Sequence, residues 1–121
     1  MKPQSLTITQ AEIDFYARLT NDANPIHTDP DFAASTAMGG TIAHGTMSLG
    51  LLWIMIEDLC PGNVCPARLR VRFTAPVRPG DTVTAGGELS KGTGDYSVWV
   101  RNQRGETIIG GKLELSGELQ A

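Results

Sequence analysis

A carboxylate and an imidazole stand five residues apart in the segment from Asp22 to His27, which reads D-A-N-P-I-H. These two types of side chain are among the commonest proton donors and acceptors in enzymes. Asn24-Pro25 between them is a strong turn signal, because a proline disfavours helical geometry in the residue before it. The turn is expected to bring Asp22 and His27 towards one point, where they can share the proton transfers of a reaction that adds or removes water.

Two other interpretations of this segment remain open. Asp22 and Asn24 can simply cap and turn the chain, as Asp and Asn commonly do. His27, Asp29 and Asp31 can hold a metal ion, but the sequence offers no second cluster of ligands for it. We therefore expect no metal site.

A second candidate segment, Ile42-Ala43-His44-Gly45, stands directly before a dense apolar run. The run extends from Met47 to Ile56, and its apolar residues fall on every side of a helical wheel, which predicts a helix that is buried all round. It is too short to span a bilayer, which takes about 20 apolar residues. Another part of the protein must therefore wrap this helix, and His44 is expected to be structural, near its start.

Two helices are predicted around the D-x-N-P-x-H turn. Thr9 and Glu12 form a capping-box pattern, so a helix should begin there and end before Asn21. Asp29-Pro30 predicts a second helix start, with the proline at the first helical position. This short helix is expected to run to about Ala37.

The remaining chain predicts strands. Leu69, Val71 and Phe73 alternate with three arginines, which is typical of a half-buried strand. Five strands are expected in all, over residues 6–8, 68–73, 82–89, 96–102 and 107–115. Glycines inside the last strands indicate bulges or close approach of another backbone. A curved antiparallel sheet around one buried helix satisfies this order, which gives an α+β fold in a single domain over residues 1–121.

A single sheet around one helix leaves an exposed edge and an uncovered flank. Pairing of two copies would cover both, so we expect a homodimer or a higher homo-oligomer.

Composition narrows the class of protein. The 121 residues are 40% hydrophobic, which indicates a globular chain, and the net charge of −3 gives no nucleic-acid footprint. The N-terminal residues lack the apolar core of a signal peptide, and no apolar run could enter a membrane as a span. Cys60 and Cys65 do not have C-x-x-C spacing and are expected to be free thiols in a reducing cytoplasm.

The order of these motifs resembles one known family. The segment from Thr20 to His27, then Asp29-Pro30, Phe32-Ala33 and the I-A-H-G element, is similar to the hydratase motif of the MaoC-like family, and P-V-R-P-G-D at residues 76–81 is similar to its P-V-x-x-G-D turn. These are (R)-specific enoyl-CoA hydratases with the hotdog fold. The resemblance implies reversible syn addition of water to a trans-2-enoyl thioester. The substrate would be an acyl-CoA or acyl-carrier-protein thioester, with no cofactor beyond its own coenzyme A or phosphopantetheine.

The resemblance also implies roles for individual residues. Asp22 would activate the water, while His27 would hold it and supply or relay the proton. Gly45 opens the buried helix, and the backbone N–H groups at a helix N-terminus suit the charge that develops on the thioester oxygen. Asn24 would order the loop, and His44 would support the site.

The sequence departs from the family on the buried helix. Many relatives carry a serine that supports the aspartate where this chain has Trp53. Ser48, one turn inside the helix, is a candidate to compensate. Trp53 is expected to belong to the hydrophobic core. If the acyl chain of the substrate reaches this part of the helix, the bulk of Trp53 would shorten the acyl pocket.

Arg68, Arg70 and Arg72 occupy one face of their strand. They form either a solvated face or a site that attracts the phosphates of coenzyme A or of a carrier protein.

Two alternatives to hydration remain open. Hotdog proteins also include thioesterases, and fold alone does not separate the two chemistries. The chain can also be a non-catalytic hotdog protein that binds acyl thioesters.

Overall fold

The computed structural model describes residues 3–59, 66–90, 92 and 95–115. Five antiparallel strands form one sheet with the order β1-β3-β4-β5-β2. In chain order they are β1 (Gln4–Thr7), β2 (Pro66–Phe73), β3 (Thr82–Leu89), β4 (Tyr96–Asn102) and β5 (Thr107–Leu115). The bounds predicted for the last three strands are confirmed, while the first strand lies earlier than residues 6–8.

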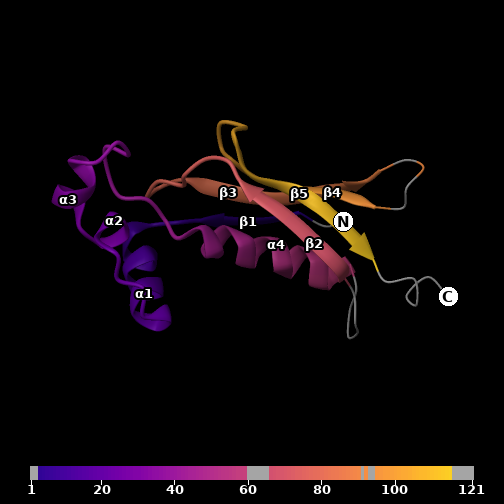
Figure 1. Ribbon diagram of the computed structural model, residues 1–121, viewed down its shortest axis with the longest axis horizontal. Coiled ribbons are helices and arrows are strands. Elements are labelled where there is room, and N and C mark those ends of the chain that lie inside the picture. The colour runs from indigo at the N-terminus through magenta and orange to yellow at the C-terminus, as the bar shows by residue number, and fades with distance from the viewer. Residues whose placement is uncertain (1–2, 60–65, 91, 93–94, 116–121) are drawn as a thin grey trace.

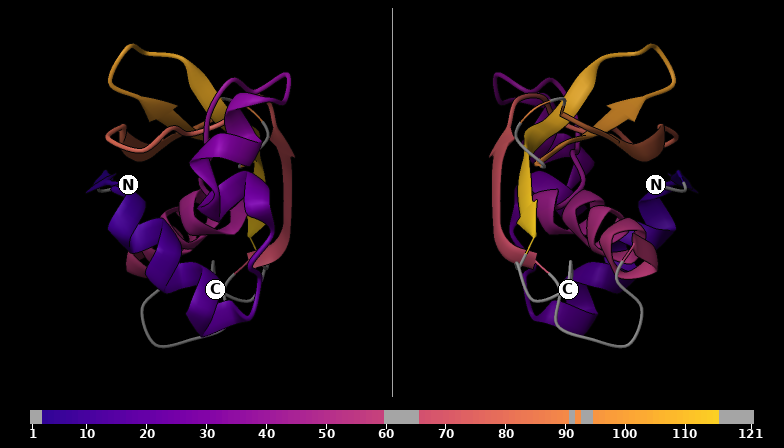
Figure 2. Two further views of the ribbon diagram at one scale, coloured as in Figure 1. Left: turned by 90° about the vertical axis from the view of Figure 1, so that its left-hand side faces the viewer. Right: turned by 90° about the vertical axis from the view of Figure 1, so that its right-hand side faces the viewer.

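The sheet curves around helix α4 (Gly45–Leu59), which runs along its concave face (Figure 1). The end views in Figure 2 show the strands passing over and beside this helix. A curved antiparallel sheet wrapped around one central helix is the predicted α+β hotdog architecture, which is confirmed.

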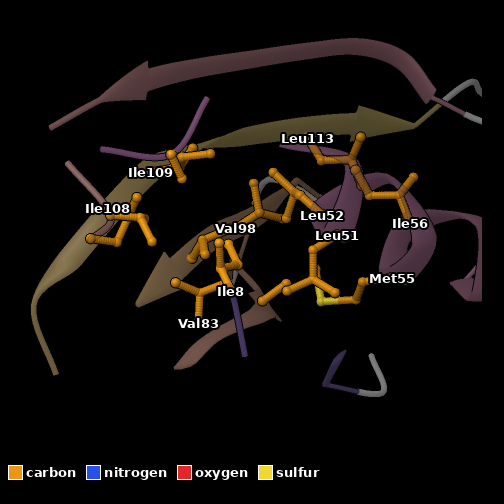
Figure 3. Close-up of a cluster of buried hydrophobic side chains, with 14 of the residues drawn as sticks. Ile8, Leu51, Leu52, Met55, Ile56, Val83, Val98, Ile108, Ile109 and Leu113 are labelled. Carbon is orange, nitrogen blue, oxygen red and sulfur yellow. The ribbon is translucent and has the colours of Figure 1, made fainter. Parts of the chain in front are cut away.

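The core lies between α4 and the inner face of the sheet (Figure 3). Leu52, Met55 and Ile56 of α4 are completely or almost completely buried, and they pack in one cluster with inner-face residues such as Val98 and Ile109. Burying one side chain of this size contributes about 1.5–3 kcal/mol. The cluster therefore holds α4, and with it the residues at the start of α4, in a fixed place under the sheet.

The prediction that α4 is buried all round was wrong for one side of the helix. Trp53 is 43% exposed and Ile54 is 53% exposed. The apolar residues do surround the helical wheel, but a single five-stranded sheet covers only part of a helix. An exposed apolar strip on α4 is therefore left in the single chain.

Three helices lie together at one end of α4 (Figure 1). They are α1 (Gln10–Thr20), α2 (Pro25–Thr28) and α3 (Pro30–Ala34). The predicted start of α1 is confirmed, because Thr9 is its N-cap and Thr9 Oγ1 accepts a hydrogen bond from the Glu12 N–H at 3.2 Å. Asp29 is confirmed as the N-cap of α3, with its carboxylate accepting from the Phe32 N–H at 3.2 Å.

The predicted end of α3 at Ala37 was wrong, since the helix ends at Ala34. The hydroxyl of Ser35 donates to the Phe32 carbonyl, and that of Thr36 donates to the Ala33 carbonyl, each at 2.7 Å. Such local side-chain bonds compete with the next backbone bonds of a helix.

The turn before β3 is tied together by the buried carboxylate of Asp81. Its oxygens accept from the Arg78 N–H at 3.0 Å and from the Gln103 amide at 2.9 Å, and the Arg104 guanidinium lies 3.6 Å away. Burial by itself would raise the pKa of Asp81, but the bonds from Gln103 and Arg78 and the charge of Arg104 hold that pKa below its ordinary value. The P-V-R-P-G-D segment is thus a structural turn that fixes the segment leading out of β2.

None of the helices in the described ranges is both long and apolar enough to cross a membrane. The prediction of free thiols at Cys60 and Cys65 falls outside the described residues.

Two strand glycines sit where another group approaches closely, as predicted. A Cβ on Gly86 would lie 2.8 Å from the indole nitrogen of Trp99, and a Cβ on Gly111 would overlap the backbone carbonyl of Arg70. At Gly110, by contrast, a Cβ would meet only a methyl group of Thr107 at 3.8 Å. The close approach at Gly111 belongs to the ladder between β2 and β5.

We expect Gly111→Ala to destabilise the protein and Gly110→Ala to leave it unchanged or slightly more stable. The first substitution forces the β2 backbone away from β5, and overpacking of this kind costs about 1–3 kcal/mol. The second adds a methyl group in open space and reduces the freedom of the unfolded chain. Urea unfolding of the two variants measures the difference, and equal stability of both would contradict the close β2–β5 approach.

Candidate functional site

A cavity of about 350 Å³ opens beside the N-terminal end of α4. Its lining comes from the start of α4 and the segment before it, from the end of β2 and the segment after it, and from β5. The residues are Met38, Ile42, Ala43, His44, Gly45, Ser48, Phe73, Thr74, Ala75, Pro76, Val77 and Ile108. The lining is predominantly apolar, with polar groups concentrated where α4 begins.

Three ionisable side chains converge next to this cavity. One carboxylate oxygen of Asp22, one ring nitrogen of His27 and one ring nitrogen of His44 all lie within 4.8 Å of one another. Asp22 is exposed, His27 is half-buried and His44 is buried. The turn therefore brings Asp22, in the loop between α1 and α2, close to His27, which belongs to α2.

The end of α1 positions Asp22. Asn21 has a left-handed backbone with φ of 56°, which ends the helix, and the Asp22 N–H donates back to the Ala17 carbonyl at 2.9 Å. Asparagine tolerates this conformation better than most residues. The chain leaves α1 sharply, so that the Asp22 side chain projects beyond the helix end.

Helix α2 positions His27. The Asn24 side chain accepts from the Ile26 N–H at 3.1 Å and caps this short helix, with Pro25 at its first position. Asn24 therefore orders the turn, as predicted from its type. The turn was predicted, but the helical turn inside it was not.

The imidazole of His27 is fixed by the backbone of Ile42. His27 Nδ1 lies 2.8 Å from the Ile42 carbonyl oxygen, and the Ile42 N–H donates to the Ile26 carbonyl at 3.1 Å. A carbonyl only accepts hydrogen bonds, so Nδ1 must carry a proton. In the neutral ring this leaves Nε2 as a free acceptor, which is the form a general base requires.

His44 ties the start of α4 to the end of α1. It is 4% exposed, and its Nε2 lies 3.0 Å from the Asp22 backbone oxygen and 3.9 Å from Oδ2 of the same residue. Its ring stacks on His27 with a centroid distance of 3.8 Å and packs against Tyr16 at 4.9 Å. His44 thus orients both members of the candidate pair.

The three side chains do not form a favourable metal site, even though their ligand atoms are close. The rings of His27 and His44 are stacked at an angle of only 24°. An imidazole binds a metal in its own plane at about 2.0–2.1 Å, so the lone pairs of two stacked rings run side by side and do not converge on one ion. His27 Nδ1 and His44 Nε2 are in addition each engaged with a backbone carbonyl.

Gly45 is the first residue of α4, so its N–H is one of the helix N-terminal groups without a partner inside the helix. The ring of Phe73 lies against it, since a Cβ on Gly45 would come within 2.9 Å of that ring. Gly45 and Phe73 together form one wall of the cavity.

The other predicted residues lie in different places. Ser48 lines the cavity, whereas Trp53 does not. Trp53 is eight residues further along α4 than Gly45, which is about 12 Å along the helix axis. In the single chain Trp53 also stands on the exposed side of α4. Its assignment to an acyl pocket stays a prediction.

The three arginines of β2 line the outer face of the sheet. Arg68, Arg70 and Arg72 are exposed, and Arg70 stands directly opposite Lys112 of β5. Arg70 and Arg72 line a surface hollow of about 440 Å³ together with Lys112. Thr74 lines both this hollow and the cavity at α4, so the two adjoin.

Sequence reasoning missed three residues that hold the site. The Gln10 amide donates to the His27 carbonyl at 2.8 Å and accepts from the Thr41 hydroxyl at 2.7 Å. The Tyr16 hydroxyl donates to Thr46 Oγ1 at 2.6 Å. Phe73 was assigned only to a strand. Nothing in the sequence around these three residues separates such contacts from those of an ordinary helix or strand residue.

Comparison with known proteins decides the family. A family model described as the MaoC like domain matches residues 1–105. The chain belongs to the MaoC-like family. The family predicted from the motifs is thereby confirmed.

Relatives of this MaoC-like chain include named enzymes. It is 39% identical over 80 residues to an (R)-specific enoyl-CoA hydratase of Rhodospirillum rubrum, with 65% of this chain and 56% of that protein covered. It is 33% identical over 129 residues to an (R)-specific enoyl-CoA hydratase of Aeromonas caviae, with 98% and 96% covered. The chain thus spans little more than half the length of the first relative and nearly all of the second.

Solved structures agree with this relationship. The structure of an (R)-hydratase from Aeromonas caviae involved in PHA biosynthesis has a TM-score of 0.79 at 29% identity, covering 95% of this chain and 92% of that one. The shared fold therefore extends over nearly the whole of both chains.

We expect the two histidines to hold opposite tautomers at neutral charge. His27 should carry its proton on Nδ1 and His44 on Nε2, because each of those atoms faces a backbone carbonyl. Nitrogen-15 NMR of the imidazole rings measures this directly above the pH at which both rings are neutral. The chain has only two histidines, so His27→Gln and His44→Gln variants assign the signals. The same tautomer in both rings would contradict the hydrogen bonds described.

Proposed function

We propose that this MaoC-like chain catalyses the reversible hydration of trans-2-enoyl thioesters to (R)-3-hydroxyacyl thioesters. The observation that carries the proposal is the convergence of the Asp22 carboxylate with His27, whose Nε2 is left free, beside a cavity headed by the N-terminus of α4. The names of the relatives support this reaction class.

The proton transfers follow from this arrangement. Asp22 accepts a proton from a water molecule as the water oxygen bonds to Cβ, and His27 Nε2 holds the same water. The electron pair of the double bond moves towards the thioester, and Cα then takes a proton that the Asp22–His27 pair returns. Both groups stand on one side of the substrate, so water adds in the syn sense. No cofactor is required beyond the carrier of the acyl group.

The charge that forms on the thioester oxygen needs hydrogen-bond donors. The Gly45 N–H at the start of α4 is the donor that we propose, since it lines the cavity and lies at the positive end of the helix dipole. The missing side chain of Gly45 lets the substrate and the Phe73 ring approach the backbone closely.

We expect Asp22→Asn and His27→Ala each to lower kcat by at least about a hundredfold, as loss of a general acid–base group does. Asp31→Asn is the matched control, because Asp31 is an exposed carboxylate of the neighbouring helix α3. Ultraviolet absorbance of the conjugated enoyl thioester measures turnover across short, medium and branched enoyl-CoAs. Circular dichroism checks that each variant is folded.

Three results would contradict this assignment. The first is wild-type turnover in both Asp22→Asn and His27→Ala. The second is release of free thiol from acyl-CoA without any hydration, which would make the chain a thioesterase. The third is binding of enoyl thioesters without turnover, which would make it a non-catalytic member of the family.

We also propose that the basic hollow on β2 attracts the phosphates of the thioester carrier. Arg70 and Lys112 are like charges directly opposite one another, an arrangement that destabilises a sheet unless an anion stands between them. Neither these two side chains nor Arg68 and Arg72 has a salt bridge within the described part of the chain. Because the hollow adjoins the cavity at Thr74, one extended substrate can occupy both.

Replacing Arg70 and Arg72 together by alanine should raise KM for an enoyl-CoA at least about tenfold while kcat stays close to the wild-type value, since even one charge-assisted contact contributes about 1.5–3 kcal/mol and 1.4 kcal/mol is a tenfold change. Added salt should raise KM of the wild type more than that of the variant. Arg101→Ala is the matched control, because Arg101 lies on β4 beside Trp99 and not in the hollow. An equal effect of the control would contradict the phosphate site.

Finally, we propose that the chain acts as a homodimer or a higher homo-oligomer. β1 and β2 each pair with one neighbour only in the described sheet, and α4 exposes Trp53 and Ile54. A second copy can extend the sheet at an edge and cover the apolar strip.

A further inference from the structure

Two buried side-chain atoms lack a hydrogen-bond partner, and both lie at the cavity. They are Ser48 Oγ and His44 Nδ1, and the described residues contain no others of this kind. Ser48 is 1% exposed and His44 is 4% exposed. Buried polar side-chain atoms are nearly always paired in native proteins, so each exception requires a physical explanation.

Ser48 departs from the usual behaviour of a serine inside a helix. Such a serine commonly donates its hydroxyl to the carbonyl four residues earlier in its own helix. The Ser48 hydroxyl makes no such bond. The donor of Ser48 is therefore unpaired in the structure, and Ser48 is one of the residues that line the cavity.

Helix geometry directs this hydroxyl towards Gly45. Residues three apart lie on the same face of a helix, and their side chains lean towards the N-terminus. Ser48 is three residues after Gly45, so its hydroxyl lies over the turn that Gly45 opens. The ring of Phe73 lies against Gly45, and Gly45, Ser48 and Phe73 all line the cavity.

We propose that the Ser48 hydroxyl is a second hydrogen-bond donor to the thioester oxygen, next to the Gly45 N–H. This inference rests on the proposed hydration of enoyl thioesters and assigns a further residue to that reaction. Ser48 transfers no proton. It donates one hydrogen bond that strengthens as negative charge forms on the oxygen.

His44 Nδ1 is the alternative partner of the same hydroxyl. His44 donates from Nε2 to the Asp22 carbonyl, so Nδ1 of the neutral ring is an acceptor, and it lies one helical turn before Ser48. The two atoms are not hydrogen-bonded in the structure. A Ser48–His44 bond would act on the orientation of Asp22, whereas a bond to the substrate would act on the thioester carbonyl. The two roles therefore have different experimental signatures.

The test compares Ser48→Ala and Ser48→Cys, which lack a strong donor, with Ser48→Thr, which keeps the hydroxyl. We expect kcat to fall about a hundredfold in the first two variants, the lower end of the range of about a hundredfold to a thousandfold for removal of one donor to an oxyanion, and to recover at least partly in Ser48→Thr. Ser5→Ala, on the exposed strand β1, is the control for a serine substitution remote from the cavity.

Infrared difference spectroscopy supplies a readout that does not depend on turnover. A saturated acyl-CoA labelled with carbon-13 at the thioester carbonyl is bound to each protein, and its carbonyl stretching frequency is compared with that in buffer. The wild type and Ser48→Thr should lower this frequency, and Ser48→Ala and Ser48→Cys should lower it less. Thermal unfolding confirms that each variant is folded.

An unchanged carbonyl frequency in both Ser48→Ala and Ser48→Cys would overturn the proposal. If the pH dependence of kcat moved while the frequency did not, the hydroxyl would serve His44, and the proposal would again be wrong. Failure of the proposed function is distinguishable from either outcome, because no enoyl thioester would then be hydrated by the wild type, whatever the carbonyl frequency of the bound acyl-CoA.

Discussion

The site depends on a pair of reciprocal hydrogen bonds between the backbone of Ile42 and the helix that carries His27. The Ile42 carbonyl accepts from the His27 ring, and the Ile42 N–H donates to the Ile26 carbonyl. Through these bonds the segment before α4 lies against α2, and α4 in turn is held under the sheet by its apolar core. A shift of α4 along the sheet would therefore move the His27 ring, the N-terminus of α4 and the cavity residues on α4 together.

A second constraint is that buried polar atoms around His44 need hydrogen-bond partners. Its Nε2 is satisfied by a backbone carbonyl, and its ring faces are covered by His27 and Tyr16, yet its Nδ1 has no partner. The Ser48 hydroxyl, one helical turn further along α4, also lacks a hydrogen-bond partner. A chain selected for stability alone would pair or remove such atoms, since a buried unpaired group costs about 1–3 kcal/mol. Their position at the cavity is consistent with a site whose hydrogen bonds are completed by a bound molecule.

The sequence predicts the architecture well because its patterns are local and periodic. The alternation around Val71 and the turn signals place four strands within a few residues, and the capping residues Thr9 and Asp29 place two helix starts. Predictions failed where the outcome depends on what lies opposite in space. Apolar residues all round α4 do not reveal that Trp53 faces away from the sheet.

In the candidate site, too, the features set by local sequence were predicted and those set by contacts between distant residues were not. The meeting of Asp22 and His27 follows from a turn that the sequence encodes locally. The roles of Gln10 and Tyr16 depend on contacts with residues 17 and 30 positions away, which no local pattern records. Phe73 reaches Gly45 only because β2 ends beside the start of α4.

The polar contacts described for Asp22, His27 and His44 lie within one continuous stretch, from Gln10 to Thr46. A backbone hydrogen bond from the Ala43 N–H to the Val77 carbonyl, at 2.8 Å, joins this stretch to the second half of the chain. The second half of the chain supplies the cavity wall opposite, through the segment from Phe73 to Val77 and through Ile108. In evolutionary terms, the two halves can vary separately. Substitutions in the wall segment can change the shape of the cavity while Asp22, His27 and His44 stay as they are. Mutation or recombination after α4 can thus reshape the cavity wall without replacing the residues that we propose to transfer protons.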